Sequence, residues 1–177
     1  ISGLEVVDAG GSQRVVISSG RQLLSVDARY GTVDWRFGAS SAVAQMTAVS
    51  DINGDGADDV FAGTADGHLF LLSGKTGDLR WQTKLPKIKD STASESQSKV
   101  SSVVAMSAED GKVAATSIDG RVSLFDVAKC SKDWDVEITA SGPQSQNFPV
   151  TAVPDTTGDG LPEILGIKGA SGPRGST

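Results

Sequence analysis

The chain has 177 residues, of which 16 are basic and 22 are acidic, so its formal net charge is -6 at pH 7. This acidic balance argues against nucleic acid as a partner, because nucleic-acid binding needs a basic surface. No stretch approaches the roughly 18 consecutive apolar residues of a membrane span, so we expect a chain that does not itself cross a membrane. The single cysteine, Cys130, excludes an internal disulfide.

Short apolar runs broken by Gly, Asp and Ser fill the chain and predict an all-β fold. The sequence contains 21 glycines and few amphipathic patterns of helical length. This composition is typical of short strands joined by tight turns. One pattern recurs: Trp35, Trp81 and Trp134 lie 46 and 53 residues apart, and each closes a similar segment, at 26–35, 72–81 and 125–134.

A period of about 40–50 residues with four short strands per repeat indicates the blades of a β-propeller. We predict four-stranded antiparallel blades that together form a single partial propeller over residues 1–177, with about three and a half blades present. Each Trp should pack on the neighbouring blade. Six to eight blades would need roughly 270–360 residues, so we expect a protein partner, or further blades of the same polypeptide, to complete the propeller. The predicted units are three blades at about 3–39, 43–85 and 99–139, half a blade at 147–168, and a flexible tail at 169–177.

The second unit contains a carboxylate-rich loop at residues 51–59. Its oxygen-bearing side chains fall at offsets 1, 3, 5 and 9, and the glycines between them let the backbone curl. Calcium takes six to eight oxygen ligands at about 2.3–2.6 Å, and such a loop supplies most of them. The alternative is an ordinary surface turn, since Asp and Asn side chains also cap turns without a metal. The predicted calcium ligands are the side chains of Asp51, Asn53, Asp55 and Asp59 and the backbone carbonyl of Ala57.

A second copy of this loop follows 104 residues later, at 155–163. The first loop resembles the first half of an EF-hand loop, but that motif needs a Glu at its twelfth position, where this chain has Ala62. Without this closing Glu, both sites should be weak, as in extracellular modules. The ligands predicted for the second, weaker site are the side chains of Asp155, Thr157, Asp159 and Glu163 and the backbone carbonyl of Leu161.

Two polar segments, 86–99 and 141–149, lie between predicted blades. Loops between the blades of a propeller line one rim of the disc, so these two segments should lie side by side. They either form a contact surface for a partner or act as spacers, and the sequence leaves both interpretations open.

Two family resemblances follow from these motifs. The turn Gly74-Lys-Thr-Gly-Asp-Leu-Arg-Trp81 resembles the repeat of quinoprotein (PQQ-like) propellers, in which the Trp docks between blades. The loop at 51–59 resembles the calcium loop of FG-GAP repeats, as in the integrin alpha-subunit propeller. Two features depart from the PQQ-like pattern: Cys130 stands where the family has Gly, and the fourth copy stops before any Trp.

The resemblances imply a non-enzymatic, calcium-binding propeller module of a secreted or cell-surface protein, which mediates protein–protein interaction or adhesion through its loops. Weak calcium sites fill only where calcium is abundant, so we expect an extracellular, cell-surface or lumenal location, the periplasm included. One alternative is a scaffold propeller of the kind that assembles outer-membrane proteins. Another is a fragment of a quinone-dependent dehydrogenase, although the vicinal Cys pair usual in those enzymes is missing. With one histidine, a Ser-His-Asp set can form only around His68.

Overall fold

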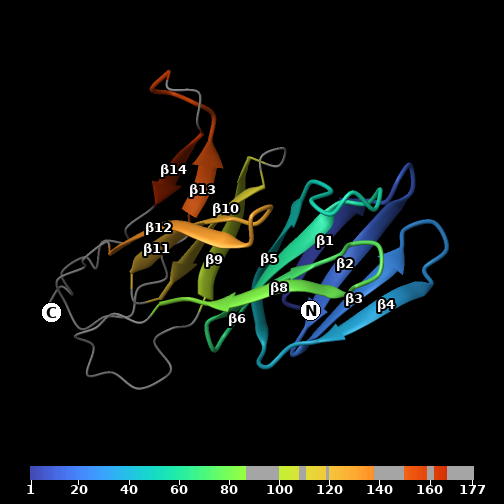
Figure 1. Cartoon of the computed structure of the whole chain (residues 1–177). Coiled ribbons are helices and arrows are strands. Elements are labelled where there is room, and N and C mark those ends of the chain that lie inside the picture. The colour runs from blue at the N-terminus through green and yellow to red at the C-terminus, as the bar shows by residue number, and fades with distance from the viewer. Residues whose placement is uncertain (87–99, 108–110, 119, 138–149, 159–161, 167–177) are drawn as a thin grey trace, which may run out of the picture.

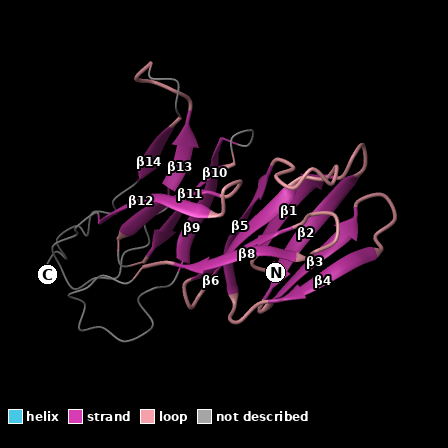
Figure 2. Cartoon of the chain, in the orientation of Figure 1, coloured by secondary structure: helices cyan, strands magenta, loops and turns pink. Residues whose placement is uncertain are grey.

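The computed structural model describes residues 1–86, 100–107, 111–118, 120–137, 150–158 and 162–166. The polar segments 87–99 and 141–149 and the tail at 169–177 lie outside these residues. The described part contains three four-stranded sheets and one two-stranded sheet, all antiparallel, and no helix (Figure 2). No described helix is therefore available to span a membrane.

Each four-stranded sheet pairs its strands in chain order, as expected for a propeller blade. Blade 1 contains β1 (Gly3–Asp8), β2 (Gln13–Ser19), β3 (Gln22–Asp27) and β4 (Val33–Gly38). Blade 2 contains β5 (Val43–Val49), β6 (Asp59–Thr64), β7 (His68–Leu72) and β8 (Leu79–Lys84). Blade 3 contains β9 (Val100–Ser107), β10 (Lys112–Ser117), β11 (Arg121–Asp126) and β12 (Ser131–Glu137). The two strands of blade 4 are β13 (Val150–Val153) and β14 (Glu163–Gly166).

The blades stand next to one another in chain order (Figure 1). The first strand of each blade contacts the first strand of the next, so β1, β5, β9 and β13 form one continuous inner side. Sheets that radiate from a shared inner row of strands are the architecture of a propeller. The predicted fold class, an all-β partial propeller of four-stranded antiparallel blades, is confirmed.

The hydrophobic core lies between blades rather than within one sheet. Blades 1 and 2 share one cluster, which includes Val16, Trp35 and Phe70. Blades 2 and 3 share a second cluster, which includes Leu71 and Phe125. Blade 2 is therefore covered on both faces, and every residue of its strand β6 is buried. This explains why β6 reads as a nearly continuous apolar run instead of an alternating one.

The three tryptophans occupy equivalent positions, as the repeat alignment predicts. Trp35, Trp81 and Trp134 pair across the sheet with the corresponding residue of the preceding strand, and a β-bulge precedes each Trp. Their burial differs, because Trp35 is 7% exposed and Trp134 is 42% exposed. Trp134 lies on the face of blade 3 that is turned toward blade 4. The structure describes only two strands of blade 4.

Candidate functional site

The carboxylate-rich loop joins β5 to β6 and is closed by its own backbone. Asp51 accepts three hydrogen bonds, from the N–H groups of Gly54 at 2.7 Å, Asp55 at 3.0 Å and Gly56 at 2.7 Å. Gly54 and Gly56 have φ angles of 74° and 87°, a left-handed conformation that glycine adopts without steric cost. The two glycines therefore produce the curl that the sequence predicts.

Asp55 connects this loop to the turn after β7. Its carboxylate accepts a hydrogen bond from the Ser73 hydroxyl at 2.7 Å, and its backbone carbonyl accepts one from the Lys75 ammonium at 2.7 Å. Partial burial raises the pKa of the Asp55 carboxyl, but hydrogen bonds from Ser73 and Asn53 outweigh burial and hold the pKa below its ordinary value.

Asp59 begins β6 and is fully buried. Its carboxylate accepts hydrogen bonds from the Ile52 N–H at 3.1 Å, the Asn53 side-chain amide at 2.8 Å and the Gly74 N–H at 3.3 Å. Burial raises the pKa of Asp59 to about 6, since the three hydrogen bonds offset only part of the desolvation and the nearby negative charges of other loop carboxylates add to it.

The fold thus brings the predicted ligands of the first calcium site into one loop, but the carboxylates of Asp51, Asp55 and Asp59 accept hydrogen bonds from N–H and O–H donors of the protein. In the described part of the chain, no three His, Cys, Asp or Glu side chains are grouped so that they could hold a metal ion. Binding would require the carboxylates to exchange some of these hydrogen bonds for metal contacts, and calcium at this loop stays a prediction.

The second predicted calcium loop is only partly described, because Asp159 and Leu161 lie outside the described residues. Glu163 accepts hydrogen bonds from the N–H groups of Thr156 and Thr157, the closest at 2.9 Å. Asp155 accepts one from the Gly158 N–H at 2.6 Å. As in the first loop, the acidic side chains cap the turn, and metal binding here also stays a prediction.

His68, Asp66 and Ser40 form a polar cluster beside the turn between β6 and β7. The Nδ1 atom of His68 lies 3.0 Å from an Asp66 carboxylate oxygen and 3.4 Å from the Ser40 hydroxyl. A catalytic triad uses the two ring nitrogens separately, one toward the Asp and one toward the Ser. Both partners here approach the same nitrogen, so this histidine cannot relay a proton between them.

The turn after β7 is where blade 1 docks on blade 2. The indole N–H of Trp35 donates a hydrogen bond to the Gly74 carbonyl at 2.9 Å. The Arg14 guanidinium donates to the carbonyls of Gly74 at 3.1 Å and Lys75 at 2.9 Å, and it also pairs with Asp34 at 3.1 Å. Two side chains of blade 1 therefore close this interface against the backbone of blade 2.

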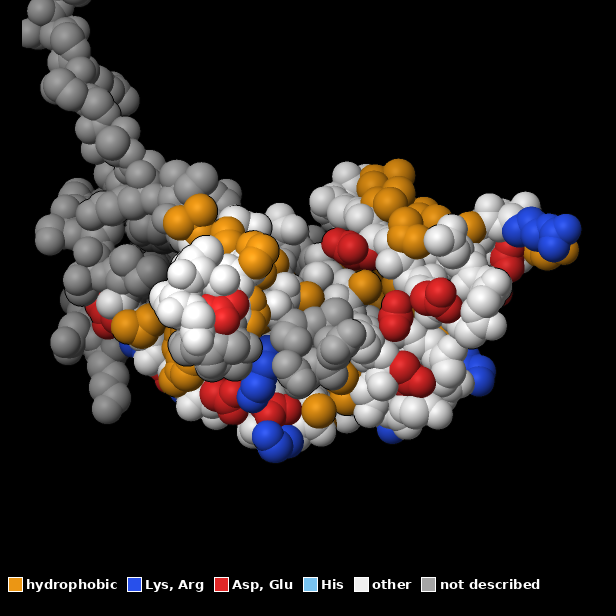
Figure 3. Space-filling model, turned by 90° about the horizontal axis from the view of Figure 1, so that it is seen from above, with side chains coloured by type: hydrophobic (Ala, Val, Ile, Leu, Met, Phe, Trp, Pro, Cys, Tyr) orange, Lys and Arg blue, Asp and Glu red, His pale blue; other side chains and the backbone are white. Residues whose placement is uncertain are grey.

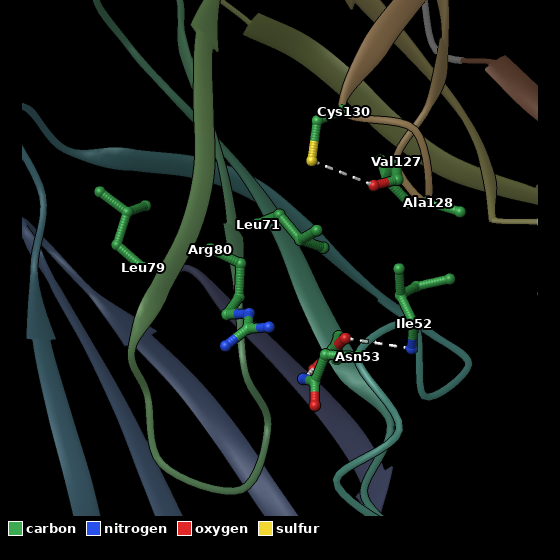
Figure 4. A pocket seen from close by; sticks show the side chains of 9 residues that line it. Ile52, Asn53, Leu71, Leu79, Arg80, Val127, Ala128 and Cys130 are labelled. Atoms are coloured by element: carbon green, nitrogen blue, oxygen red, sulfur yellow. Dashed lines mark hydrogen bonds between the residues drawn. The ribbon is translucent and has the colours of Figure 1, made fainter.

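A cavity of about 260 Å³ lies at the corresponding place between blades 2 and 3 (Figure 4). Sequence reasoning missed this cavity, although the cysteine in a glycine position of the third repeat was a signal of it. Its lining comes from the loop before β6, the hairpin of β7 and β8, and the turn after β11. The lining residues are Ile52, Asn53, Asp59, Leu71, Leu79, Arg80, Val127, Ala128 and Cys130.

Comparison with known protein families identifies the repeat. The sequence model described as outer membrane protein assembly factor BamB matches residues 3–153. The chain belongs to this BamB family. The match also confirms the resemblance to PQQ-like propeller repeats, whereas the resemblance to FG-GAP calcium loops stays a prediction.

Solved structures share the fold of this BamB-family chain at low sequence identity. BamB from Moraxella catarrhalis is 21% identical, with a TM-score of 0.56, over 85% of this chain and 41% of that one. Sqt1 from Saccharomyces cerevisiae is 12% identical, with a TM-score of 0.70, over 85% and 41%. BBS1N, solved in complex with ARL6DN, is 11% identical, with a TM-score of 0.64, over 92% and 46%.

The chain thus spans less than half the length of each of these three structures. No curated protein is significantly similar to it in sequence.

Proposed function

We propose that this chain is part of a non-enzymatic β-propeller scaffold that binds other proteins during outer-membrane protein assembly. The observation that carries the proposal is the BamB family match over residues 3–153, which coincides with the row of blades. The chain spans under half of the related structures, so its part in the activity of a whole BamB-like protein is our proposal.

The exposed surface of blade 1 supports a role in protein contact. Leu4 and Val6 in β1 are 59% and 51% exposed, on the face of the sheet turned away from blade 2. Hydrophobic side chains remain uncovered on the blade 1 half of the molecule (Figure 3). Uncovered apolar patches of this kind mark surfaces that contact other protein. We propose that a further blade, of the same polypeptide or of a protein partner, covers this face.

A scaffold for outer-membrane proteins works in the periplasm, which is also the calcium-accessible location that the loops imply. We propose this compartment for the chain. The protein that the scaffold would bind is then an unfolded β-barrel protein, which exposes unpaired strand edges and apolar side chains until it inserts into the outer membrane.

The test is binding of a urea-unfolded outer-membrane β-barrel protein, diluted into buffer with the 177-residue chain. We expect a complex by sedimentation velocity and slower aggregation of the barrel protein. The matched control is a urea-unfolded cytosolic helical protein, which should form no complex. Equal binding to both proteins, or to neither, would contradict a role in outer-membrane protein assembly.

We further propose that loop 51–59 binds calcium weakly and that the bound ion stiffens the connection between β5 and β6. The negative charges of Asp55 and Asp51 contribute to the raised pKa of the Asp59 carboxyl, and a divalent cation would neutralise that repulsion. Binding is expected in the range of about 10⁻⁴–10⁻³ M, as in extracellular modules.

Calorimetric titration of chelator-treated protein tests this calcium proposal. Asp51→Asn should remove the heat of binding at the first loop, whereas Asp78→Asn, at an exposed turn, should leave it unchanged. An absence of heat at millimolar calcium would overturn it. Calcium binding without recognition of unfolded barrel proteins would instead favour a secreted or cell-surface adhesion module.

A further inference from the structure

The blade 3 turn that lines the cavity carries side chains at two positions where the turn of blade 2 has glycine. In blade 2, Gly74 and Gly77 form the turn on which Trp35 of blade 1 docks. The shared register of Trp35, Trp81 and Trp134 places Val127 and Cys130 at the corresponding positions of blade 3. The turn that faces Trp81 therefore carries side chains where the turn that faces Trp35 has none.

Cys130 stands at the position where Gly77 makes room for the Trp35 ring in the neighbouring interface. A Cβ atom at Gly77 would lie 2.6 Å from the Trp35 ring, too close for any side chain to be accommodated. Cys130 has such a Cβ and shares the left-handed backbone, with a φ of 53° against 76° for Gly77. The Trp81 ring instead packs edge-on against Phe125, with ring centroids 5.9 Å apart. A cavity of about 260 Å³, lined in part by Val127 and Cys130, lies beside this turn.

The charges at the equivalent positions are also reversed relative to the interface between blades 1 and 2. The bulge before each Trp leaves one residue out of the strand pairing: Asp34 in blade 1, Arg80 in blade 2 and Asp133 in blade 3. Asp34 pairs with Arg14, and Asp133 pairs with Lys112. In blade 2 the position of Arg14 and Lys112 is taken by Asp59.

Asp59 and Arg80 both line the cavity, but they form no ion pair. Asp59 is occupied by three hydrogen bonds from N–H groups. Arg80 is exposed and makes no hydrogen bond or ion pair with the described residues. In Figure 4 the Arg80 side chain lies between those of Leu79 and Asn53. Among the described residues, the cavity therefore presents an aliphatic wall beside the Arg80 guanidinium, which has no ion-pair partner there.

We propose that this pocket binds an aromatic residue of a protein partner together with a carboxylate of that partner that lies beside the ring. The ring would occupy the cavity, against Leu71, Leu79 and Val127. The carboxylate would pair with Arg80, since a guanidinium binds a carboxylate through two parallel hydrogen bonds.

This inference rests on the proposed protein-binding function, but its experiment probes the pocket directly. The probe is N-acetyl-L-tryptophan, which combines an indole ring with a carboxylate. Cys130 is the only cysteine of the chain and is exposed at the pocket. Its rate of alkylation by iodoacetamide therefore reports occupancy without any label. We expect saturable protection by N-acetyl-L-tryptophan and none by N-acetyl-L-alanine, which lacks the ring.

Two variants separate the ring from the charge. Arg80→Gln should weaken binding of N-acetyl-L-tryptophan by about tenfold, because a charge-assisted pair is lost. The same variant should leave the weaker binding of N-acetyl-L-tryptophanamide, which has no carboxylate, unchanged. Cys130→Gly should allow Trp81 to dock as Trp35 does and should abolish binding, measured by amide chemical shifts of Leu71 and Val127.

The outcomes decide the proposal independently of the scaffold function. Protection that N-acetyl-L-alanine matches, or that Arg80→Gln leaves unchanged, would overturn it. So would full binding by a folded Cys130→Gly protein. Because Arg80 is exposed, Arg80→Gln keeps the proposal testable even if the glycine variant does not fold. Failure to bind unfolded barrel proteins would leave these pocket measurements intact.

Discussion

The two interfaces of blade 2 are built from the same repeat but differ in packing, because one is filled by side chains and the other contains a cavity. Toward blade 1, an indole ring and a guanidinium fill the space above the turn at 74–77 and bond to its backbone. Toward blade 3, the equivalent turn at 127–130 carries side chains, and a cavity remains. The blade 3 turn has Cys130 where the blade 2 turn has Gly77, while the strand pairing around the two turns is the same.

The difference shows how a propeller can vary its surface while its blades stay the same. Strand pairing depends on backbone hydrogen bonds, which tolerate many side chains, whereas blade docking depends on steric fit at a few turn positions. Substitutions at these turn positions therefore change the contact between blades first.

Trp35→Ala should have the largest effect on stability, because it removes the ring that fills the sealed interface. Truncation of a buried Trp costs about 3–5 kcal/mol. Trp134→Ala is the matched control, since Trp134 is 42% exposed, and it should cost less than about 1 kcal/mol. Urea denaturation of both variants provides the measurement, and similar losses for both would show that the two rings do not differ in packing.

Gly77→Ala should cause the next largest loss of stability, about 2–4 kcal/mol, because it adds left-handed backbone strain and a clash with Trp35. Gly31→Ala separates the two causes. Gly31 has a similar φ of 68° but no atom within 4 Å of an added Cβ, so its substitution should cost only about 1–2 kcal/mol. Equal costs by urea denaturation would mean that the contact with Trp35 contributes little.

Because of Asp59, we expect the free energy of unfolding to rise as pH falls from 7 to 5. Its pKa is about 6 in the folded chain, against 3.8 as the ordinary value. The folded state therefore binds the proton more tightly than the unfolded state, and protonation favours folding by about 1–1.5 kcal/mol over this range. In calcium-free buffer, Asp59→Asn should remove this part of the pH dependence and Asp78→Asn should retain it. A pH profile that Asp59→Asn leaves unaltered would contradict the assignment.

Cys130→Gly should have the smallest effect on stability, a gain of about 0.5–1 kcal/mol from relief of the left-handed backbone. Cys130→Ala keeps the Cβ atom and should give no gain. Thermal unfolding of the two variants tests the difference. A gain shared by both would point to removal of the thiol, not to relief of the backbone.

The sequence was enough to predict the fold class, the register of the tryptophans and the curl of loop 51–59. These features depend on local rules that are visible along the chain: alternation of apolar residues, turn glycines and a period that repeats. The family resemblance rested on the same short motifs, and the match over residues 3–153 confirms its PQQ-like part.

Only the tertiary structure showed which way side chains turn once the blades pack. Loop 51–59 has the spacing of a calcium site, yet its carboxylates accept hydrogen bonds from Gly54, Ser73 and Gly74, two of which follow another strand. Likewise, the sequence marks Cys130 as a departure from the repeat. Only the tertiary structure shows that Cys130 and Arg80 line one cavity. Such contacts join residues far apart in sequence, and close packing decides them at a precision of tenths of an ångström that no local pattern carries.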